Sequence, residues 1–257
     1  MIDTHAHLYD EYFIQQWDVA YAEMIQAGIE EVWLPNCDQA SWEALWNLYL
    51  SNSDFCKPML GLHPTYVKED FEQQLAFFEK ELQSKKVLAI GEIGLDYYWD
   101  VSFKSQQIAA FEIQCHWALE HHLWIDVHCR KAYADLLAIL KKKEFKDVTG
   151  IIHCFSGDAR EANTLVDLGF TLGIGGVITY KNANLYQDIQ HVPLTHLVLE
   201  TDAPYLSPVP YRGKPNSPAY LGLIAQKLAD YREINVSELI EITSQNARAL
   251  KAYSSFD

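Results

Sequence analysis

The chain begins with the stretch MIDTHAH (residues 1–7), in which His5 and His7 stand two positions apart. Residues i and i+2 share one face of a β-strand, whereas on an α-helix they point about 200° apart. As a strand, this stretch would present both imidazoles to the same neighbour. A single histidine in an apolar stretch is often a hydrogen-bonded core residue, so the pair alone leaves a structural role and a ligand role open.

Seven further runs have the composition of short strands and alternate with helical patterns. They are EEVWLPN (30–36), KPMLGLH (57–63), KVLAIGEIG (86–94), WIDVHC (124–129), TGIIHCF (149–155), FTLGIGG (170–176) and HLVLETD (196–202). Amphipathic segments between them include 12–28, 70–84, 105–122 and 159–169. Repeated strand–helix units predict an α/β protein with a (β/α)₈, or TIM, barrel. The tail after Ser217 predicts the last barrel helix and one extra C-terminal helix over 235–253.

No linker-like stretch divides the 257 residues, so we expect a single domain over residues 1–257. A doubly wound open sheet is the structural alternative. The glycines of LGIGGVITY (172–180) suggest a nucleotide-binding loop, but the G-x-G-x-x-G spacing is incomplete and no acidic residue follows at the expected distance. We therefore interpret this segment as the seventh strand running into its loop.

The formal net charge is −15, and residues 1–56 contain ten acidic residues and no Lys or Arg. Such a chain gains little from phosphate neutralisation, so broad binding of duplex DNA is not expected. The five cysteines form no C-x-x-C pair, which favours reduced thiols. No basic leader and no apolar run of about 18 residues is present, so we expect a cytoplasmic protein that does not bind membranes. The oligomeric state is not defined by the sequence, and a monomer is favoured.

Six possible metal ligands fall at the carboxyl ends of the expected strands. They are His5 and His7 (first strand), Glu92 (fourth), His128 (fifth), His153 (sixth) and Asp202 (eighth). In a barrel these ends meet on one face, where active sites are built. Four imidazoles and two carboxylates suit divalent metals and are enough for two ions. Taken alone, Glu92 fits a buried hydrogen-bonded carboxylate and Asp202 fits a turn cap, but the shared position of all six favours one site.

Several motifs resemble, in the same order, those of the TatD-type metal-dependent deoxyribonucleases within the amidohydrolase-like barrel superfamily. They are DTHAHL (3–8), GEIGLDYY (91–98), IDVHCR (125–130), IHCFSG (152–157) and ETDAPYLSP (200–208). The resemblance implies a two-metal phosphodiesterase in which His5, His7 and Asp202 hold one ion and His128 and His153 complete the second. It also implies that Glu92 bridges both ions. The motif GLHP (61–64) matches as well and implies that His63 lies near the substrate rather than among the ligands.

Two adjacent metal ions can activate a water molecule and stabilise the attacking and leaving oxygens of a phosphoryl group. We expect Asp202 and Glu92 to be the catalytic residues, with Asp202 accepting the proton of the attacking water. Substrate contacts are expected from His63, Arg130, Arg212 and Tyr97. Lys181 and Lys214 are further candidates for phosphate contacts, and the consecutive Tyr97, Tyr98 and Trp99 are candidates for base stacking.

The function predicted is that of a deoxyribonuclease with two divalent ions (Mg²⁺, Mn²⁺ or Zn²⁺) that acts as an exonuclease on single-stranded or frayed 3′ ends of DNA. The alternative is a small-molecule amidohydrolase that opens a lactone or cyclic amide or hydrolyses a phosphotriester. Such enzymes commonly bridge their metals with a carboxylated lysine on strand four, where this chain has Glu92. A scaffold that binds metal without catalysis would lack a base, and Asp202 can supply one.

Overall fold

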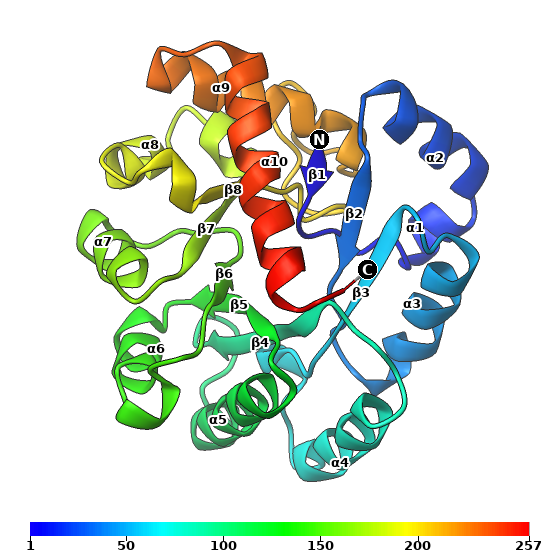
Figure 1. The fold of residues 1–257 in the computed structure, drawn as a ribbon, viewed down its shortest axis with the longest axis vertical. Helices are drawn as coiled ribbons and strands as arrows, with labels where there is room; N and C mark the ends of the chain where they lie inside the picture. Colours follow the sequence, from blue (N-terminus) through cyan, green and yellow to red (C-terminus); the bar gives the residue numbers. More distant parts are fainter. Residues whose placement is uncertain (257) are drawn as a thin grey trace.

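Eight short parallel strands form the centre of the computed structural model, which describes residues 1–256 (Figure 1). They are β1 (Ile2–Asp3), β2 (Glu31–Leu34), β3 (Cys56–Leu60), β4 (Ala89–Asp96), β5 (Trp124–Arg130), β6 (Gly150–Ile152), β7 (Thr171–Ile174) and β8 (Leu197–Leu199). The strands pair in chain order from β1 to β8. Hydrogen bonds from Thr4 N to Leu199 O (3.1 Å) and from His7 N to Ala203 O (2.7 Å) join the two ends. This nearly closed barrel confirms the predicted (β/α)₈ fold and excludes the open sheet.

Helices surround the strands, as Figure 1 shows. They are α1 (Glu11–Ile14), α2 (Trp17–Gln26), α3 (Gln39–Ser51), α4 (Phe71–Leu82), α5 (Lys104–His121), α6 (Tyr133–Leu140), α7 (Ala159–Asp167), α8 (Leu185–Ile189), α9 (Leu221–Arg232) and α10 (Val236–Tyr253). The segment 12–28, expected as one helix, is divided between α1 and α2, with Gln15 and Gln16 outside both. Within residues 1–256, no helix combines the length and the apolar character needed to cross a membrane.

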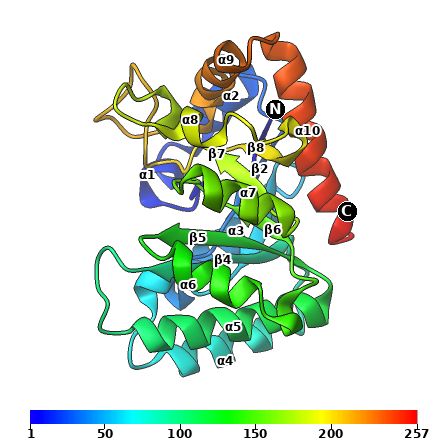
Figure 2. The same cartoon turned by 90° about the vertical axis from the view of Figure 1, so that its left-hand side faces the viewer.

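Helix α10 is the predicted extra helix, and it covers the amino-terminal end of the barrel. Its Ala247, together with Phe256, belongs to a buried cluster that includes Trp33 of β2 and Trp124 of β5. In Figure 2, α10 lies along one end of the molecule, while the loops after β4 and β8 project from the opposite end. The carboxyl ends of the strands therefore stay accessible, and this is the end where TIM barrels carry their active sites.

The strands differ from the sequence-based expectation mainly at their carboxyl ends. The first ladder stops at Asp3, and Ala6 forms only an isolated bridge with Ala203. His5 and His7 thus lie just beyond β1, although backbone hydrogen bonds to Trp33 of β2 and to the segment after β8 still hold this part of the chain. Strand β4, in contrast, is buried along its full length and contains the carboxylates of Glu92 and Asp96. Buried charges need partners, and the neighbouring strand ends supply them.

Candidate metal centre and active site

The structure brings all six predicted ligands together at the carboxyl-terminal end of the barrel, around the side chain of Glu92. Its two carboxylate oxygens face different groups of histidines. Oε2 lies 3.5 Å from His5 Nε2 and 3.7 Å from His7 Nε2. Oε1 lies 3.0 Å from both His128 Nδ1 and His153 Nε2. One carboxylate therefore stands between two pairs of imidazoles that come from opposite sides of the barrel.

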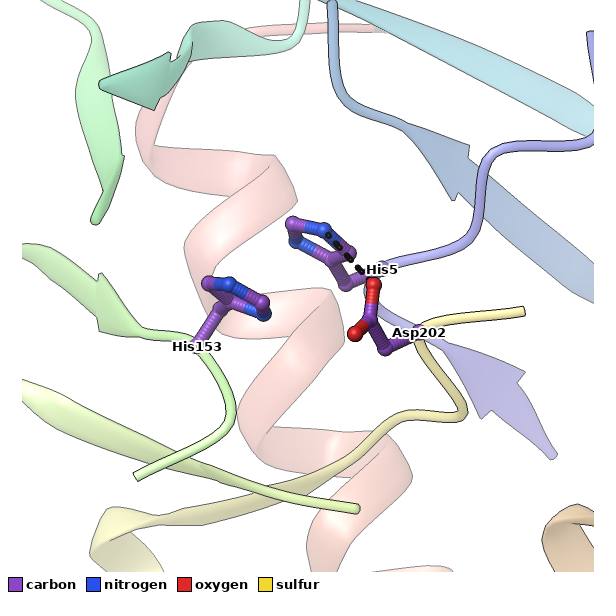
Figure 3. A group of neighbouring side chains, drawn as sticks. All are labelled: His5, His153 and Asp202. Atoms are coloured by element: carbon purple, nitrogen blue, oxygen red, sulfur yellow. Dashed lines mark ion pairs between the residues drawn. The ribbon is translucent and has the colours of Figure 1, made fainter. Parts of the chain in front are cut away.

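Asp202 lies on the His5 and His7 side of this centre. Its Oδ1 is 3.4 Å from His7 Nε2 and 3.7 Å from His5 Nε2. Figure 3 shows the side chains of His5, His153 and Asp202 converging from three separate segments, and the rings of His5 and His153 stack with centroids 3.8 Å apart. The Asp202 side chain is 13% exposed, compared with 4% for Glu92. Asp202 is thus the centre's carboxylate that lies nearer to solvent.

The backbone of Asp202 adopts a φ of 58°, in the left-handed region that non-glycine residues rarely occupy. Two backbone hydrogen bonds hold it there, from Asp202 N to His5 O (2.9 Å) and from Tyr205 N to Asp202 O (2.7 Å). Conformations of this kind cost free energy and cluster at functional sites. The bond to His5 also ties the carboxylate directly to the segment that carries the first pair of histidines.

The charges in this buried centre balance one another. Burial opposes ionisation of Glu92, but the charges of His63, His153 and His5 hold the pKa of this carboxyl well below its usual range. Burial and His153 both favour neutral His5, yet Asp126 and Glu92 raise its pKa to about 9. Without a cation, the carboxylates are therefore ionised and protons on the imidazoles neutralise them. A divalent cation would take the place of those protons.

Each of the four central histidines turns its second ring nitrogen toward another partner. Asp126 Oδ2 lies 2.8 Å from His5 Nδ1, and Asp96 Oδ2 lies 2.9 Å from His128 Nε2. The hydroxyl of Tyr9 lies 2.9 Å from His7 Nδ1, and Glu200 Oε1 lies 3.5 Å from His153 Nδ1. The hydrogen-bonded contacts of His5, His7 and His128 fix which nitrogen faces the centre, as in metal sites where a carboxylate orients a ligating histidine, whereas His153 Nδ1 makes no hydrogen bond.

Sequence reasoning missed these four outer partners, although a signal for two of them was present. Asp126 stands two residues before His128, and Glu200 stands two residues before Asp202. The spacing is the same as that between His5 and His7, so each pair would share one face of the strand expected from the sequence, although in the structure Glu200 and Asp202 lie beyond β8. Tyr9 lies in the loop after β1, where no periodic pattern points to it.

Close approach of β4 and β5 brings His128 to Glu92. Gly94 has a φ of 141°, and a Cβ at this position would lie 2.0 Å from the backbone oxygen of His128. Only glycine avoids that clash, because it has no Cβ. The second glycine of GEIG thus fixes the distance between the strand that carries Glu92 and the strand that carries His128.

His63 also reaches the centre, with its Nε2 3.2 Å from Glu92 Oε1. The backbone N–H of Thr65 donates a hydrogen bond of 3.1 Å to His63 Nδ1. Because Nδ1 accepts this bond, the proton of the neutral ring sits on Nε2. His63 is therefore arranged to donate a hydrogen bond into the centre, and together with Glu92 and His128 it also forms one of the groups whose ligand atoms lie close enough to hold a metal ion.

The expected substrate contacts lie around the rim of the same end. Arg130 ends β5, with its Cζ 3.7 Å from the ring centre of Tyr98, and exposed Arg212 lies over the ring of Tyr180 at 4.1 Å. Tyr97 is half-buried, and its hydroxyl donates a hydrogen bond of 2.9 Å to Asp135. Of the three consecutive aromatic residues considered for base stacking, Tyr98 and Trp99 are the exposed ones.

The donors present fit divalent metal ions. Three sets of side chains each offer ligand atoms within 4.8 Å of one another, namely His5–His7–Glu92, His5–His153–Asp202 and His63–Glu92–His128. Imidazole nitrogens and carboxylate oxygens are the usual ligands of zinc and manganese. Since Glu92 belongs to the sets on both sides, the geometry suits a carboxylate shared between two ions.

Comparison with known proteins identifies the family. The model of the family described as TatD related DNase matches residues 2–251. The uncharacterized metal-dependent hydrolase YabD of Bacillus subtilis (strain 168) is 35% identical over 255 residues, which cover 97% of this chain and 98% of the relative. A protein of Edwardsiella piscicida named 3′-5′ ssDNA/RNA exonuclease TatD is 32% identical over 256 residues, with coverage of 97% and 98%.

Comparison with solved structures supports the same family. The crystal structure of YJJV, a TatD homologue from Escherichia coli K12, superposes with a TM-score of 0.92 at 28% identity and covers 97% of both chains. Sequence and fold therefore agree over nearly the whole length of the chain. The chain therefore belongs to the TatD-related DNase family and is a metal-dependent hydrolase.

Proposed function

We propose that this protein is a deoxyribonuclease that removes nucleotides from single-stranded or frayed 3′ ends of DNA, using two divalent ions such as Mg²⁺, Mn²⁺ or Zn²⁺. The observation that carries the proposal is the position of Glu92, whose two oxygens face separate pairs of histidines. The exonuclease name of the Edwardsiella piscicida relative supports the choice of a nucleic acid substrate with a free end.

In this proposal His5, His7 and Asp202 would hold one ion, His128 and His153 would hold the other, and Glu92 would be shared between them. Two ions at such a site lower the pKa of bound water and neutralise charge on a phosphoryl group. The outer partners Asp126, Tyr9 and Asp96 then have a defined role, since they keep Nε2 of His5 and His7 and Nδ1 of His128 directed inward.

Asp202 accepts the proton of the attacking water. Burial opposes its ionisation, but the hydrogen bond with His7 and the charges of His153 and His5 keep the pKa of Asp202 below its usual range. It is therefore ionised at neutral pH and lies nearer to solvent than Glu92. His63 donates its Nε2 proton in a hydrogen bond to a phosphate oxygen, and Arg130 and Arg212 bind the neighbouring phosphates. Tyr97 supports the loop that follows β4.

The preference for a strand end follows from burial and charge. The reacting phosphate has to reach side chains that are almost entirely buried, and a terminal nucleotide enters such a site more readily than the middle of a duplex. With a net charge of −15, the surface also repels a backbone that continues past the site on both sides. Affinity then depends on the centre and a few cations at the rim, so we expect a weak dependence on salt concentration.

The test is cleavage of linear single-stranded DNA, blunt duplex and covalently closed duplex, with end labels that report 3′ and 5′ shortening. A panel of lactones and phosphotriesters is assayed in parallel, each reaction in Mg²⁺ and in Mn²⁺. We expect shortening from the 3′ end of linear DNA, fastest on single strands. Faster turnover of a lactone than of every DNA would favour the small-molecule amidohydrolase. Equal cleavage of closed and linear duplex would remove the need for an end.

A further inference from the structure

The loop after β4 exposes two large aromatic side chains at the rim of the centre. Tyr98 is 51% exposed and Trp99 is 69% exposed, the highest value among the exposed large hydrophobic side chains of residues 1–256. Their rings meet edge to face, with centroids 4.9 Å apart and planes at 85°. Exposed apolar surface of this kind, placed beside a catalytic centre, is typical of a binding site rather than of an inert surface.

Arg130 joins the two rings into one unit. Its guanidinium carbon lies 3.7 Å from the centre of the Tyr98 ring and 5.3 Å from that of Trp99. The planar guanidinium group stacks on the aromatic face while its N–H groups remain directed sideways. Since Arg130 follows His128 by two residues on β5, both side chains project from the same face of the strand. The guanidinium group of Arg130 therefore lies on the same side of β5 as the His128 imidazole.

A single buried carboxylate fixes this unit relative to the centre. Asp96 Oδ1 accepts hydrogen bonds from the backbone N–H groups of Tyr98 (2.8 Å) and Trp99 (3.4 Å), while its Oδ2 contacts His128 Nε2 at 2.9 Å. Gln107 in turn bonds both the N–H and the carbonyl of Asp96. The aromatic rings thus have a defined place next to His128 before any substrate binds.

We propose that Tyr98, Trp99 and Arg130, here called the aromatic platform, bind the nucleobase that adjoins the scissile phosphate on the His128 side. The inference rests on the proposed nuclease function and specifies one of its subsites. Trp99 stacks on the base, Tyr98 supports the guanidinium of Arg130, and the N–H groups of Arg130 bind the adjoining phosphate. Because every base has a flat π-face, the platform holds bases without selecting their sequence.

The test compares Trp99→Ala with the unsubstituted enzyme on a single-stranded thymidine decamer and on two decamers with one abasic nucleotide, at the terminal or the penultimate position of the 3′ end. We expect the KM of Trp99→Ala for the intact decamer to rise about tenfold, with kcat nearly unchanged. One of the two abasic decamers lacks the base that Trp99 would hold. On that decamer Trp99→Ala and the unsubstituted enzyme should have equal KM values, because no base is present to stack. Trp99→Phe should restore most of the affinity.

Tyr253→Ala is the matched control, since Tyr253 is a 48% exposed aromatic residue on α10 at the opposite end of the barrel. Its kinetics should equal those of the unsubstituted enzyme. If the enzyme cleaves the decamer and Trp99→Ala keeps the original KM, the platform is wrong while the nuclease function stands. If the unsubstituted enzyme cleaves no oligonucleotide, the proposed function fails and the platform fails with it.

Discussion

The buried centre and the aromatic platform meet where β4 and β5 end, with Asp96 contacting both, but they are built differently. The centre's histidines and carboxylates lie on the strands or just beyond them and are largely buried, and His5, His7 and His128 are each held by a second hydrogen-bonding partner. The platform's two rings project from a loop, and one carboxylate and one guanidinium hold them. The rigid barrel thus carries the chemistry, whereas the loops are free to vary with the substrate. Substitutions in the two regions should accordingly change different kinetic parameters.

The largest effect should come from Glu92→Ala, which removes the group between the two pairs of histidines. We expect activity to fall to background and the metal content to drop below that of the unsubstituted protein, which should carry up to two divalent ions per chain. Elemental analysis after soaking in Mn²⁺ or Zn²⁺ measures this directly. Unchanged metal content in Glu92→Ala would show that Glu92 is not the bridge.

Asp202→Asn should rank second, because it removes a proton acceptor while nearly preserving shape. We expect kcat to fall by roughly 10²–10⁴-fold with little change in KM, the opposite of the pattern expected for Trp99→Ala. Circular dichroism should be unchanged. Near-normal turnover would exclude Asp202 as the base and would weaken the distinction between the centre and the platform.

Asp126→Asn should have an intermediate effect, since Asp126 touches the centre only through His5 Nδ1. Loss of an orienting carboxylate typically weakens metal affinity by about 10–100-fold. Competition with a fluorescent chelator measures the change. Asp147→Asn is the control, because Asp147 is exposed and remote from the ligands. Equal metal affinity in both variants would mean that the outer partners have no orienting role.

The smallest effect concerns the dependence of stability on pH without metal. The pKa of His5 is raised to about 9 in the folded protein, against 6.5 for an unperturbed histidine. The folded state therefore holds an extra proton between these values, and its stabilisation is lost as pH rises through 9. We expect the Tm in EDTA to fall between pH 6.5 and 9, and to fall less with saturating Mg²⁺, which displaces that proton. A Tm that rises in EDTA would contradict the charge balance described for the centre.

Much of the centre could be predicted because strands have a period of two and barrel strands end on a common face. That logic identified His5 with His7 and anticipated the convergence of Glu92, His128, His153 and Asp202 on one place. The same logic extends one layer deeper, to Asp126 and Glu200, but a buried carboxylate below a ligand is recognisable only once the neighbouring strand is known to face it.

The side chains around the entrance to the centre could not be predicted to the same degree. Tyr97, Tyr98 and Trp99 are consecutive in a loop, where no periodic pattern tells which side chain faces solvent. The structure turns Tyr97 toward Asp135 and leaves the other two exposed. The position of Arg130 over Tyr98 depends on how β4 and β5 pair, which places Asp96 beside Arg130. Such contacts across strands have no signature in a single sequence.

The most direct test of the central claim is anomalous diffraction from crystals of this protein soaked in Mn²⁺. The account predicts two manganese peaks on opposite sides of Glu92, each within coordination distance of one of its carboxylate oxygens. One manganese ion should also contact His5 and His7, and the other should contact His128 and His153. A single peak that touches only one oxygen of Glu92, or two peaks that both avoid it, would contradict the bridged centre on which the proposed function rests.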